Sequence, residues 1–284
     1  MTQANNAVRV FAPAKINLFL HVGEKRADGF HPLQSLAVFA EIGDELELRR
    51  SQVYALSIRG PFADDLSNGD DNLILKTARL VSLEADISLT KNLPVASGIG
   101  GGSADAAATL RGLMQLWKPE DSDGFMRHVA PKIGSDVPVC IDSKPAWMEG
   151  RGEILTTVTG VPPMPMVLVN PGVSVSTADV FRTLERRRGM DMARVVSFRG
   201  FSDLLAFLHT TVNDLEGPAI ALQPVIAETL SVLAAQPGAR LTRMSGSGAT
   251  CFSLFESEAQ ANQAAKAILA MHPQWWVQAT RIAQ

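Results

Sequence analysis

Apolar residues recur at every second position from Ile16 to Val22, near the start of the chain. Because successive side chains of a strand point to opposite faces, this alternation predicts a β-strand over residues 9–22. The odd-numbered positions from Lys15 onward form the opposite face of the predicted strand. Lys15 and Asn17 therefore project from the same side. Two polar residues on one side of an otherwise apolar strand need either solvent or a polar partner.

Strand-like and helix-like patterns alternate along the rest of the first half. Short strands are predicted at residues 33–40, 44–49 and 54–59, and a helix at residues 72–84. Apolar residues spaced by about 3.6 positions predict a helix over residues 104–117, packed on a core. Ser103 is well placed to be the N-cap of that helix.

The Pro-rich stretch at residues 161–165 is the best candidate for a domain boundary. After it the pattern predicts a strand at residues 166–169, mostly helices up to residue 235, and a glycine loop at residues 245–248. A strand up to residue 255 and an amphipathic helix from Glu258 follow. Interleaved helices and strands without repeats predict an α+β fold in two domains.

Composition narrows the class of ligand. The chain has 284 residues, of which 46% are hydrophobic, so it can bury a large core and form two ordinary domains. The net charge of −3 argues against the dense positive field that nucleic acid or an anionic membrane surface requires. We therefore expect a small-molecule ligand, with no nucleic-acid or membrane partner.

The two cysteines, Cys140 and Cys251, are far apart and have neither metal-ligand nor redox spacing. They are expected to be buried small hydrophobic residues in a reducing compartment. The N-terminus has no basic segment followed by an apolar one, and no run approaches the roughly 20 apolar residues that cross a bilayer. We expect a soluble, cytoplasmic protein.

Four glycines lead directly into the predicted helix start within the segment PVASGIGGGSA. Glycine lets consecutive backbone N–H groups converge on an anion, and the first turn of a helix adds its own N–H groups and dipole. Such a loop favours a phosphate, although an ordinary turn before a helix is the alternative. The pattern matches neither a Walker A loop nor a dinucleotide fingerprint, and the chain has no protein-kinase HRD or DFG element. The candidate loop consists of Pro94, Val95, Ala96, Ser97, Gly98, Ile99, Gly100, Gly101, Gly102, Ser103 and Ala104.

Asp136 lies in GSDVPV, where the pattern places it after a flexible pair and before a strand. An aspartate there is more often a turn or capping residue than a base. It becomes a candidate base if Lys15 lies near it, because a cation keeps the carboxylate ionised and a hydroxyl between them could lose its proton. A second glycine turn, in SGSGATCF, directly precedes the strand that ends near residue 255.

These four segments, in this order and at these spacings, resemble the motifs of the GHMP kinases. PAKINL is similar to their first motif, PVASGIGGGSADAAA to their phosphate loop and SGSGATCF to their third. The segments RADGFHPLQSL, DDNLI, GSDVPV, GRGE, NPGVSVSTADVF and NDLE resemble the members of this family that act on 4-diphosphocytidyl-2-C-methyl-D-erythritol. The resemblance covers most of the chain. It implies a nucleotide-binding domain over residues 1–160, a substrate-side domain over residues 161–284, and a cleft between them.

The resemblance also implies an activity: ATP- and Mg²⁺-dependent phosphorylation of the 2-hydroxyl group of that substrate, on the non-mevalonate route to isoprenoid precursors. Asp136 would be the general base, and Lys15 would hold the carboxylate and the hydroxyl in position. The partner would be a small molecule with a cytidine diphosphate moiety, and the chain a monomer or weak homodimer.

The family pattern carries over to the binding residues as well. The phosphate loop would wrap the triphosphate, and the residues that border the adenosine would be Asn72, Leu73, Ile74 and Lys91. The cytosine ring would lie between two phenylalanines, with a histidine at its edge and two polar residues orienting the substrate: Phe30, Phe181, His31, Asn17 and Thr177. Without the motif, core packing would be an equal explanation for either phenylalanine.

The chain departs from its relatives at two places. Many members have tyrosine at the position of Phe30, so the ring is kept here and a hydroxyl contact is lost. Much of the wider family has serines at the positions of Gly101 and Gly102, where a loop serine helps to hold magnesium. The metal ligands therefore stay unknown.

Three alternatives remain open. The chain could be another GHMP kinase, acting on homoserine, mevalonate or a sugar. It could be a catalytically silent relative that senses these ligands. A nucleotide-binding structural module is the third.

Overall fold

The computed structural model describes residues 7–185, 189 and 192–284. By its internal contacts the chain divides into two compact units. Unit 1 comprises Met1–Ala14, Ile42–Val95 and Gly100–Ser143, and unit 2 comprises Lys15–Glu41, Ala96–Ile99 and Lys144–Gln284. The two units interleave along the sequence, and a domain boundary at residue 160 stays a prediction.

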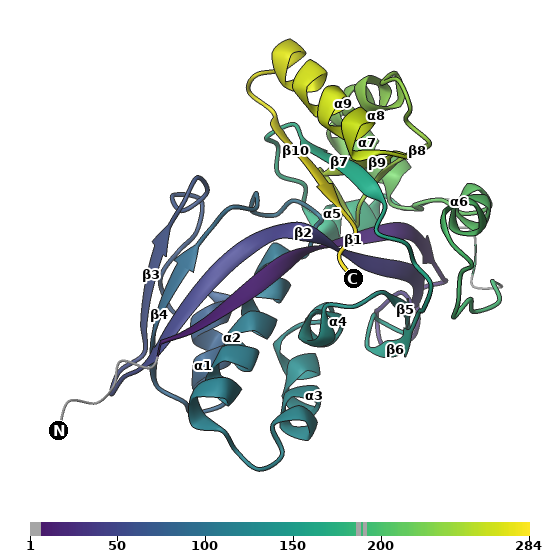
Figure 1. Cartoon of the computed structure of the whole chain (residues 1–284). Coiled ribbons are helices and arrows are strands. Elements are labelled where there is room, and N and C mark those ends of the chain that lie inside the picture. The colour runs from purple at the N-terminus through teal and green to yellow at the C-terminus, as the bar shows by residue number, and fades with distance from the viewer. Residues whose placement is uncertain (1–6, 186–188, 190–191) are drawn as a thin grey trace. The chain divides into compact units, whose positions relative to one another are not determined.

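Unit 1 is built on a mixed sheet with helices on one side. Its strands β3 (Ala55–Arg59), β4 (Ala85–Thr90) and β2 (Leu33–Arg50) follow in that order, and β1 (Val8–Val22) also pairs with β2. β3 is parallel to β4, whereas β2 is antiparallel to it with Glu45 opposite Thr90. Helices α1 (Leu73–Leu80), α2 (Gly101–Trp117) and α3 (Ser122–Ile133) lie on the same side of these strands (Figure 1).

Close packing fixes α2 against this sheet. Its apolar stripe is buried from Ala104 to Leu116, and Leu46 and Leu48 of β2 are buried as well. A Cβ atom on Gly112 would lie only 2.5 Å from Cδ1 of Leu48, so the Leu48 side chain of β2 packs directly against the helix backbone. This contact anchors the helix that begins at the glycine loop.

Unit 2 contains an antiparallel sheet in the order β10 (Trp276–Arg281), β7 (Pro165–Asn170), β9 (Cys251–Leu254) and β8 (Leu241–Met244). Helices α8 (Val225–Ala234) and α9 (Glu258–Met271) cover one side of it (Figure 1). The shorter helices are α5 (Thr177–Arg182), α6 (Phe201–His209) and α7 (Glu216–Leu222). β5 (Ala146–Glu149) pairs with the first part of β2 and with β6 (Ile154–Thr157).

Several sequence predictions are confirmed. The first strand runs from Val8 to Val22, the strand after the Pro-rich stretch is β7, and the predicted C-terminal helix is α9, capped by the Ser257 hydroxyl on the N–H of Gln260. Helices α5 to α8 fall in the predicted helical stretch, where residues 186–188, 190 and 191 lie outside the described residues. The α+β fold class is confirmed.

Four local predictions are wrong. The strands predicted at 33–40 and 44–49 form one strand, β2, because Gly43 marks a close approach and not a turn. A Cβ on Gly43 would lie 2.2 Å from the carbonyl oxygen of Ala12. The helix predicted at 72–84 ends at Leu80, since residues from Ala85 onward pair in the sheet as β4.

The other two errors concern helix starts. Ser103 is not an N-cap: α2 begins at Gly101, and its N-cap is Gly100, whose positive φ of 65° suits a glycine. Asp136 precedes a helix and not a strand. Helix α4 (Val137–Asp142) follows it directly, with Pro138 in the first turn, where the missing N–H of proline is tolerated.

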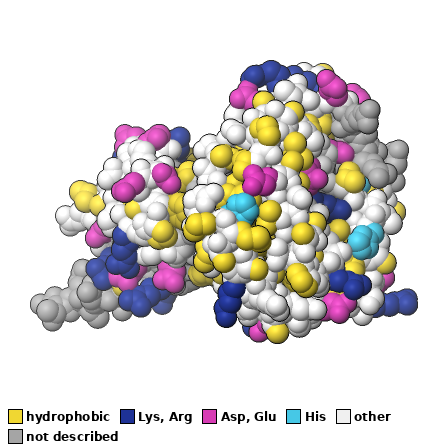
Figure 2. All heavy atoms as spheres, turned by 90° about the horizontal axis from the view of Figure 1, so that it is seen from above, with side chains coloured by type: hydrophobic (Ala, Val, Ile, Leu, Met, Phe, Trp, Pro, Cys, Tyr) yellow, Lys and Arg dark blue, Asp and Glu magenta, His cyan; other side chains and the backbone are white. Residues whose placement is uncertain are grey.

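Acidic and basic side chains are interspersed on the face seen in Figure 2, which agrees with the small net charge. Cys140 and Cys251 are both buried free thiols, as predicted. Within the described part of the chain, no helix combines the length and apolar character that crossing a bilayer requires.

Candidate active site

The glycine loop contacts two other predicted motifs within unit 2. The N–H of Lys15 on β1 donates to the carbonyl oxygen of Ile99 at 2.9 Å, and the N–H of Thr250 donates to that of Ser97 at 3.0 Å. The Ser245 hydroxyl donates to the carbonyl oxygen of Gly98 at 3.1 Å. Strand β1, the first glycine loop and the second glycine loop therefore meet along residues 97–99.

Gly98 allows the two glycine loops to contact each other closely. It has a φ of +76°, and a Cβ atom there would lie 2.5 Å from the carbonyl oxygen of Ser245 and 2.7 Å from that of Gly248. The backbone conformation and the close approach both exclude a larger residue. The two glycine-rich segments are thus packed main chain against main chain.

Asn17 lies beside this junction. Its N–H donates to the Ser245 hydroxyl at 3.1 Å, and its side-chain amide donates to the Ser35 hydroxyl at 2.7 Å. The amide oxygen of Asn17 is buried and has no hydrogen-bond partner among the described residues. A buried acceptor without a partner is costly unless something else pairs with it, so this atom is a candidate contact for a ligand. Lys15 is also buried, with 3% of its surface exposed.

In unit 1 the loop ends at the N-terminus of α2. Gly100 supplies no side-chain cap, so the N–H groups of the first turn are left to other acceptors. A Cβ on Gly101 would lie 3.1 Å from the Lys91 ammonium nitrogen, which places this buried lysine directly under the helix start. An anion at a helix N-terminus gains from both the free N–H groups and the dipole.

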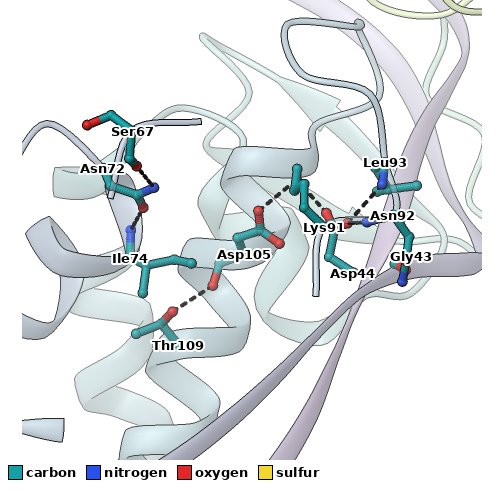
Figure 3. A network of polar contacts seen from close by, with 10 residues as sticks. All are labelled: Gly43, Asp44, Ser67, Asn72, Ile74, Lys91, Asn92, Leu93, Asp105 and Thr109. Atoms are coloured by element: carbon teal, nitrogen blue, oxygen red, sulfur yellow. Dashed lines mark hydrogen bonds and ion pairs between the residues drawn. The ribbon is translucent and has the colours of Figure 1, made fainter. Parts of the chain in front are cut away.

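Lys91 is the centre of a buried ionic network, shown in Figure 3. Its ammonium group lies 2.5 Å from Oδ2 of Asp44 and 2.8 Å from Oδ2 of Asp105. Oδ1 of Asp44 accepts the N–H groups of Asn92 and Leu93 at 2.6 and 2.9 Å. The network therefore joins the chain just before the glycine loop to the first turns of α2 just after it.

The three charges in this network are not equivalent. Burial raises the pKa of Asp105 to about 7, against the opposing effect of Lys91, and the nearby Asp44 raises it further. Burial alone would lower the pKa of Lys91, but the carboxylates of Asp105 and Asp44 outweigh it and raise that pKa. Oδ1 of Asp105 has no hydrogen-bond partner among the described residues, whereas Asp44 accepts two backbone N–H groups. Asp105 is thus the member that most readily takes up a proton.

The predicted adenosine residues surround the same helix start. Asn72 caps α1: its side-chain oxygen accepts the N–H of Ile74 at 2.9 Å, and its amide group donates to the carbonyl oxygen of Ser67 at 2.7 Å. A Cβ on Gly102 would contact Leu73 at 3.4 Å. The α1 N-terminus is therefore adjacent to the α2 N-terminus, while the Lys91 side chain is directed to two carboxylates.

Asp136 belongs to unit 1 and is the N-cap residue of α4. Its carboxylate makes no capping hydrogen bond, and the residue is partly exposed. Lys15 belongs to unit 2. The pairing of these two residues stays a prediction.

Aromatic and polar side chains gather between the β1–β2 loop and α5 in unit 2. The rings of His31 and Phe181 are stacked with centroids 5.6 Å apart, and Nδ1 of His31 lies 3.0 Å from the carbonyl oxygen of Gly23. Phe30 is 47% exposed, and the Arg151 guanidinium lies over its ring at 3.7 Å. An exposed phenylalanine is not core packing, so one alternative for Phe30 is removed.

Thr177 begins α5, one helical turn before Phe181, so both project from the same face of that helix. The Thr177 hydroxyl lies 2.8 Å from the Ser247 hydroxyl of the second glycine loop. Within unit 2, therefore, α5 connects the predicted cytosine residues with the loop that contacts Gly98.

The sequence predicts no role for Asp44, Asp105, Ser35 or Ser245, although the last three lie within the motif segments. The partner of each is distant in the chain, so the local pattern does not reveal the contact. Among the described residues, no group of three or more His, Cys, Asp and Glu side chains could hold a metal ion.

Comparison with protein families places two matches on the chain. The family of GHMP kinase N-terminal domains matches residues 72–144, and the family of GHMP kinase C-terminal domains matches residues 195–274. The first match contains the glycine loop, Asp136, and Lys91 and Asp105 of the ionic network. The second contains the glycine loop at residues 245–248.

Individual relatives match over nearly their whole length. A 4-diphosphocytidyl-2-C-methyl-D-erythritol kinase of Cereibacter sphaeroides is 50% identical over 279 residues, which are 96% of this chain and 98% of the relative. A protein of the same name from Paracoccus denitrificans is 49% identical, with 97% of each chain covered.

Solved structures are similar as well. A crystal structure of 4-(cytidine 5'-diphospho)-2C-methyl-D-erythritol kinase has a TM-score of 0.78 and 31% identity, with 98% of this chain and 100% of that chain covered. A homoserine kinase from Cytophaga hutchinsonii, at 18% identity and a TM-score of 0.72, is similar in fold alone, with coverage of 99% and 96%.

Proposed function

The chain belongs to the GHMP kinases, a family of small-molecule kinases, and we propose that it phosphorylates the 2-hydroxyl group of 4-diphosphocytidyl-2-C-methyl-D-erythritol. The observation that carries the proposal is the near-full-length identity to relatives named for this substrate. Membership of the family implies ATP as the phosphoryl donor. The reaction belongs to the non-mevalonate route to isoprenoid precursors.

The proposed step is an in-line phosphoryl transfer. The oxygen of the substrate hydroxyl attacks the γ-phosphorus, the bond from that phosphorus to the bridging oxygen of ADP breaks, and the hydroxyl proton passes to Asp136. Lys15 is proposed to help hold the substrate hydroxyl in position and to counter the charge near the transferred group. Such a reaction depends mainly on positioning and electrostatic stabilisation.

The glycine loop is proposed to hold the triphosphate. Its support is the uncapped start of α2 in unit 1 and the conformation of Gly98 in unit 2. Lys91 lies beneath Gly101, and its ion pairs with Asp44 and Asp105 hold the start of α2, where the proposed phosphate site begins. The proposed adenosine contacts, Asn72 to Ile74, lie next to the same helix start.

Mg²⁺ is proposed to accompany ATP, where it would neutralise charge on the β- and γ-phosphates. Mg²⁺ is usually held by one or two protein carboxylates together with substrate phosphates and water. The described residues, which hold no cluster of three acidic or histidine ligands, fit this mode and not an all-protein cage. The protein ligands stay unassigned.

We place the cytosine ring of the substrate between Phe30 and Phe181, with His31 at its edge. The support is their common location in unit 2, the exposure of Phe30 and the stacked geometry of His31 and Phe181. Stacking recognises a flat ring, and hydrogen bonds select which ring. Asn17, with its unpaired buried oxygen, and Thr177 are proposed to orient the substrate.

Acceptor specificity tests this proposal. ADP release is measured with ATP and, in separate reactions, the cytidyl substrate, homoserine, mevalonate and galactose. We expect the highest kcat/KM with the cytidyl substrate. A higher value with any of the other three would reject the proposed substrate while leaving the kinase family intact.

Replacing Asp136 by asparagine separates an enzyme from a silent relative. Loss of the general base is expected to lower kcat by at least about 10²-fold. The matched control is Asp142→Asn at the other end of α4, which removes an exposed ion pair to Arg127 and should leave turnover nearly unchanged. Turnover of the Asp136 variant within a few fold of the parent would mean that Asp136 is not the base.

We also propose a cytoplasmic site of action. The support is chemical: both cysteines are buried free thiols, and the two relatives compared carry the name of a metabolic kinase. Measuring the enzyme in cytoplasmic and membrane fractions tests this, and activity confined to the membrane fraction would contradict it.

A further inference from the structure

Arg111, on the third turn of α2, connects three elements of unit 1 through main-chain carbonyl groups. Nη1 donates to the carbonyl oxygen of Cys140 at 2.6 Å and to that of Ile141 at 3.3 Å. Nη2 donates to the carbonyl oxygen of Phe11 on β1 at 2.6 Å. Neither the family motifs nor the sequence pattern points to this residue.

Two of the carbonyl groups that Arg111 binds belong to Cys140 and Ile141 in the last turn of α4. The Cys140 carbonyl oxygen also accepts the Ser143 hydroxyl at 2.9 Å. β1 pairs with β2, and Phe11 directs its carbonyl toward α2. A cation at the C-terminal end of a helix is also favoured by the helix dipole. The guanidinium group therefore binds α4 at its end and β1 at its edge.

The other end of α4 carries Asp136. The N–H of Cys140 donates to the main-chain carbonyl oxygen of Asp136 at 3.4 Å, so the peptide unit next to the one bound by Arg111 is hydrogen-bonded to the backbone of the proposed base. With six residues α4 is about 9 Å long, and a shift of its C-terminal end is passed to its N-cap without much loss. The helix that presents Asp136 is thus oriented from the phosphate-loop helix.

We infer that Arg111 is a positioning residue for phosphoryl transfer, which holds Asp136 in register with the N-terminus of α2. The inference rests on the proposed function, because it gives Arg111 a role only through the proposed base. β1, the third element held by Arg111, reaches Lys15 four residues after Phe11. Within unit 1, one side chain therefore holds the phosphate-loop helix, the helix that follows Asp136 and the first part of β1 together.

Arg127 provides a matched control. It lies on α3 and also binds the C-terminal end of α4, through an ion pair with Asp142 at 3.1 Å in which both side chains are about half exposed. Among the described residues, the ion pair of Arg127 is with α4 and involves neither α2 nor β1. Replacing it removes a positive charge next to the same helix end while leaving the Arg111 connection in place.

The test compares Arg111→Met, Arg111→Lys and Arg127→Met with the parent, using kcat and KM for both substrates. Arg111→Met is expected to lower kcat roughly 10- to 100-fold, because small misplacements of a reacting group cost about that much. Arg111→Lys keeps the charge but not the forked geometry, so it should recover part of the loss. Arg127→Met should stay within about twofold of the parent, as exposed ion pairs contribute little.

A double-mutant cycle separates positioning from a general structural role. If Arg111 acts through Asp136, then Arg111→Met should cost no more than about threefold in the Asp136→Asn background, since residues that act as a unit are not additive. The same fold loss in both backgrounds would overturn the inference, and so would a folded Arg111→Met enzyme with parental kcat. Rates are measured well below each melting temperature. Should Arg111→Met fail to fold, the cycle is run with Arg111→Lys.

This design keeps the two proposals apart. Parental turnover of Asp136→Asn alone would reject Asp136 as the base, and with it the role of Arg111. A large loss in Asp136→Asn combined with an additive effect of Arg111→Met would reject only the positioning role.

Discussion

Replacing Lys91 by methionine removes the ammonium group that lies between two buried carboxylates, and we expect it to destabilise unit 1 strongly. Methionine has a similar length and volume, so it leaves little cavity. The side chains of Lys91 and Asp44 are 2% and 0% exposed, and the Asp105 carboxylate is buried beside them. Without the cation, both carboxylates must be buried unpaired or take up protons.

Breaking a buried ion pair from one side costs about 3–5 kcal/mol, because the remaining charge is left uncompensated. At roughly 2–3 °C per kcal/mol for a chain of this size, the melting temperature should fall by about 6–15 °C. The loss should be larger at pH 8 than at pH 5.5, since Asp105 takes up a proton more easily as the pH falls. The pKa of Asp105, raised to about 7 by burial, already favours its protonated form at pH 5.5.

Thermal and urea unfolding of the parent and of Lys91→Met at both pH values provide the assay. Lys76→Met is the control, because Lys76 is an exposed residue of α1 in the same unit, and it should change the free energy of unfolding by no more than about 0.5 kcal/mol. A free energy of unfolding of Lys91→Met within about 1 kcal/mol of the parent at pH 8 would mean that the network contributes no net stability, contrary to this prediction.

Three further predictions concern single side chains. The pKa of Asp105 is raised to about 7, so the stability that this group contributes is present below pH 4 and is lost as the pH rises through 7. The free energy of unfolding of Asp105→Asn in urea should therefore depend less on pH than that of the parent between pH 4 and 7. An unchanged pH dependence would contradict this prediction. Gly98→Ala introduces strain at a positive φ and a close contact with a backbone oxygen, so it should lower the free energy of unfolding by at least about 2 kcal/mol. The control Gly217→Ala, at a position with open space, should be tolerated, and similar unfolding midpoints for the two variants would contradict the prediction. Phe181→Ala should raise KM for the cytidyl substrate by about 10-fold or more without changing KM for ATP. The control Phe125→Ala on α3 should change neither KM. An unaltered KM for the cytidyl substrate in Phe181→Ala would show that Phe181 does not contact the cytosine ring.

Regular elements were predictable where periodicity and caps agree. Strand β1 and helix α9 show their period over many residues, and Ser257 marks the start of α9. Glycines were harder to interpret, because the same residue type serves a turn or a close approach. Gly43 allows β1 to approach β2, and Gly100 begins α2 in place of Ser103. Which of these uses applies depends on neighbours that the local sequence does not contain.

The candidate site was predictable in part for a related reason. The glycine loop is contiguous, so its composition alone indicates anion binding. The partners of the network around Lys91 are separated by 47 and 14 residues, and those of Arg111 by up to 100, so no local pattern marks them. Such contacts exist only once β1, α2 and α4 are packed, and only the structure of unit 1 identifies them.

Asp136 is proposed to take the proton from the 2-hydroxyl of a cytidine-diphosphate-linked substrate. A crystal structure of the chain with a non-hydrolysable ATP analogue and 4-diphosphocytidyl-2-C-methyl-D-erythritol measures this directly, as the distance from that hydroxyl oxygen to the Asp136 carboxylate. We expect hydrogen-bond distance, about 2.6–3.2 Å, with the cytosine ring between Phe30 and Phe181. A bound substrate whose hydroxyl lies out of reach of Asp136 would contradict the proposed role of this residue.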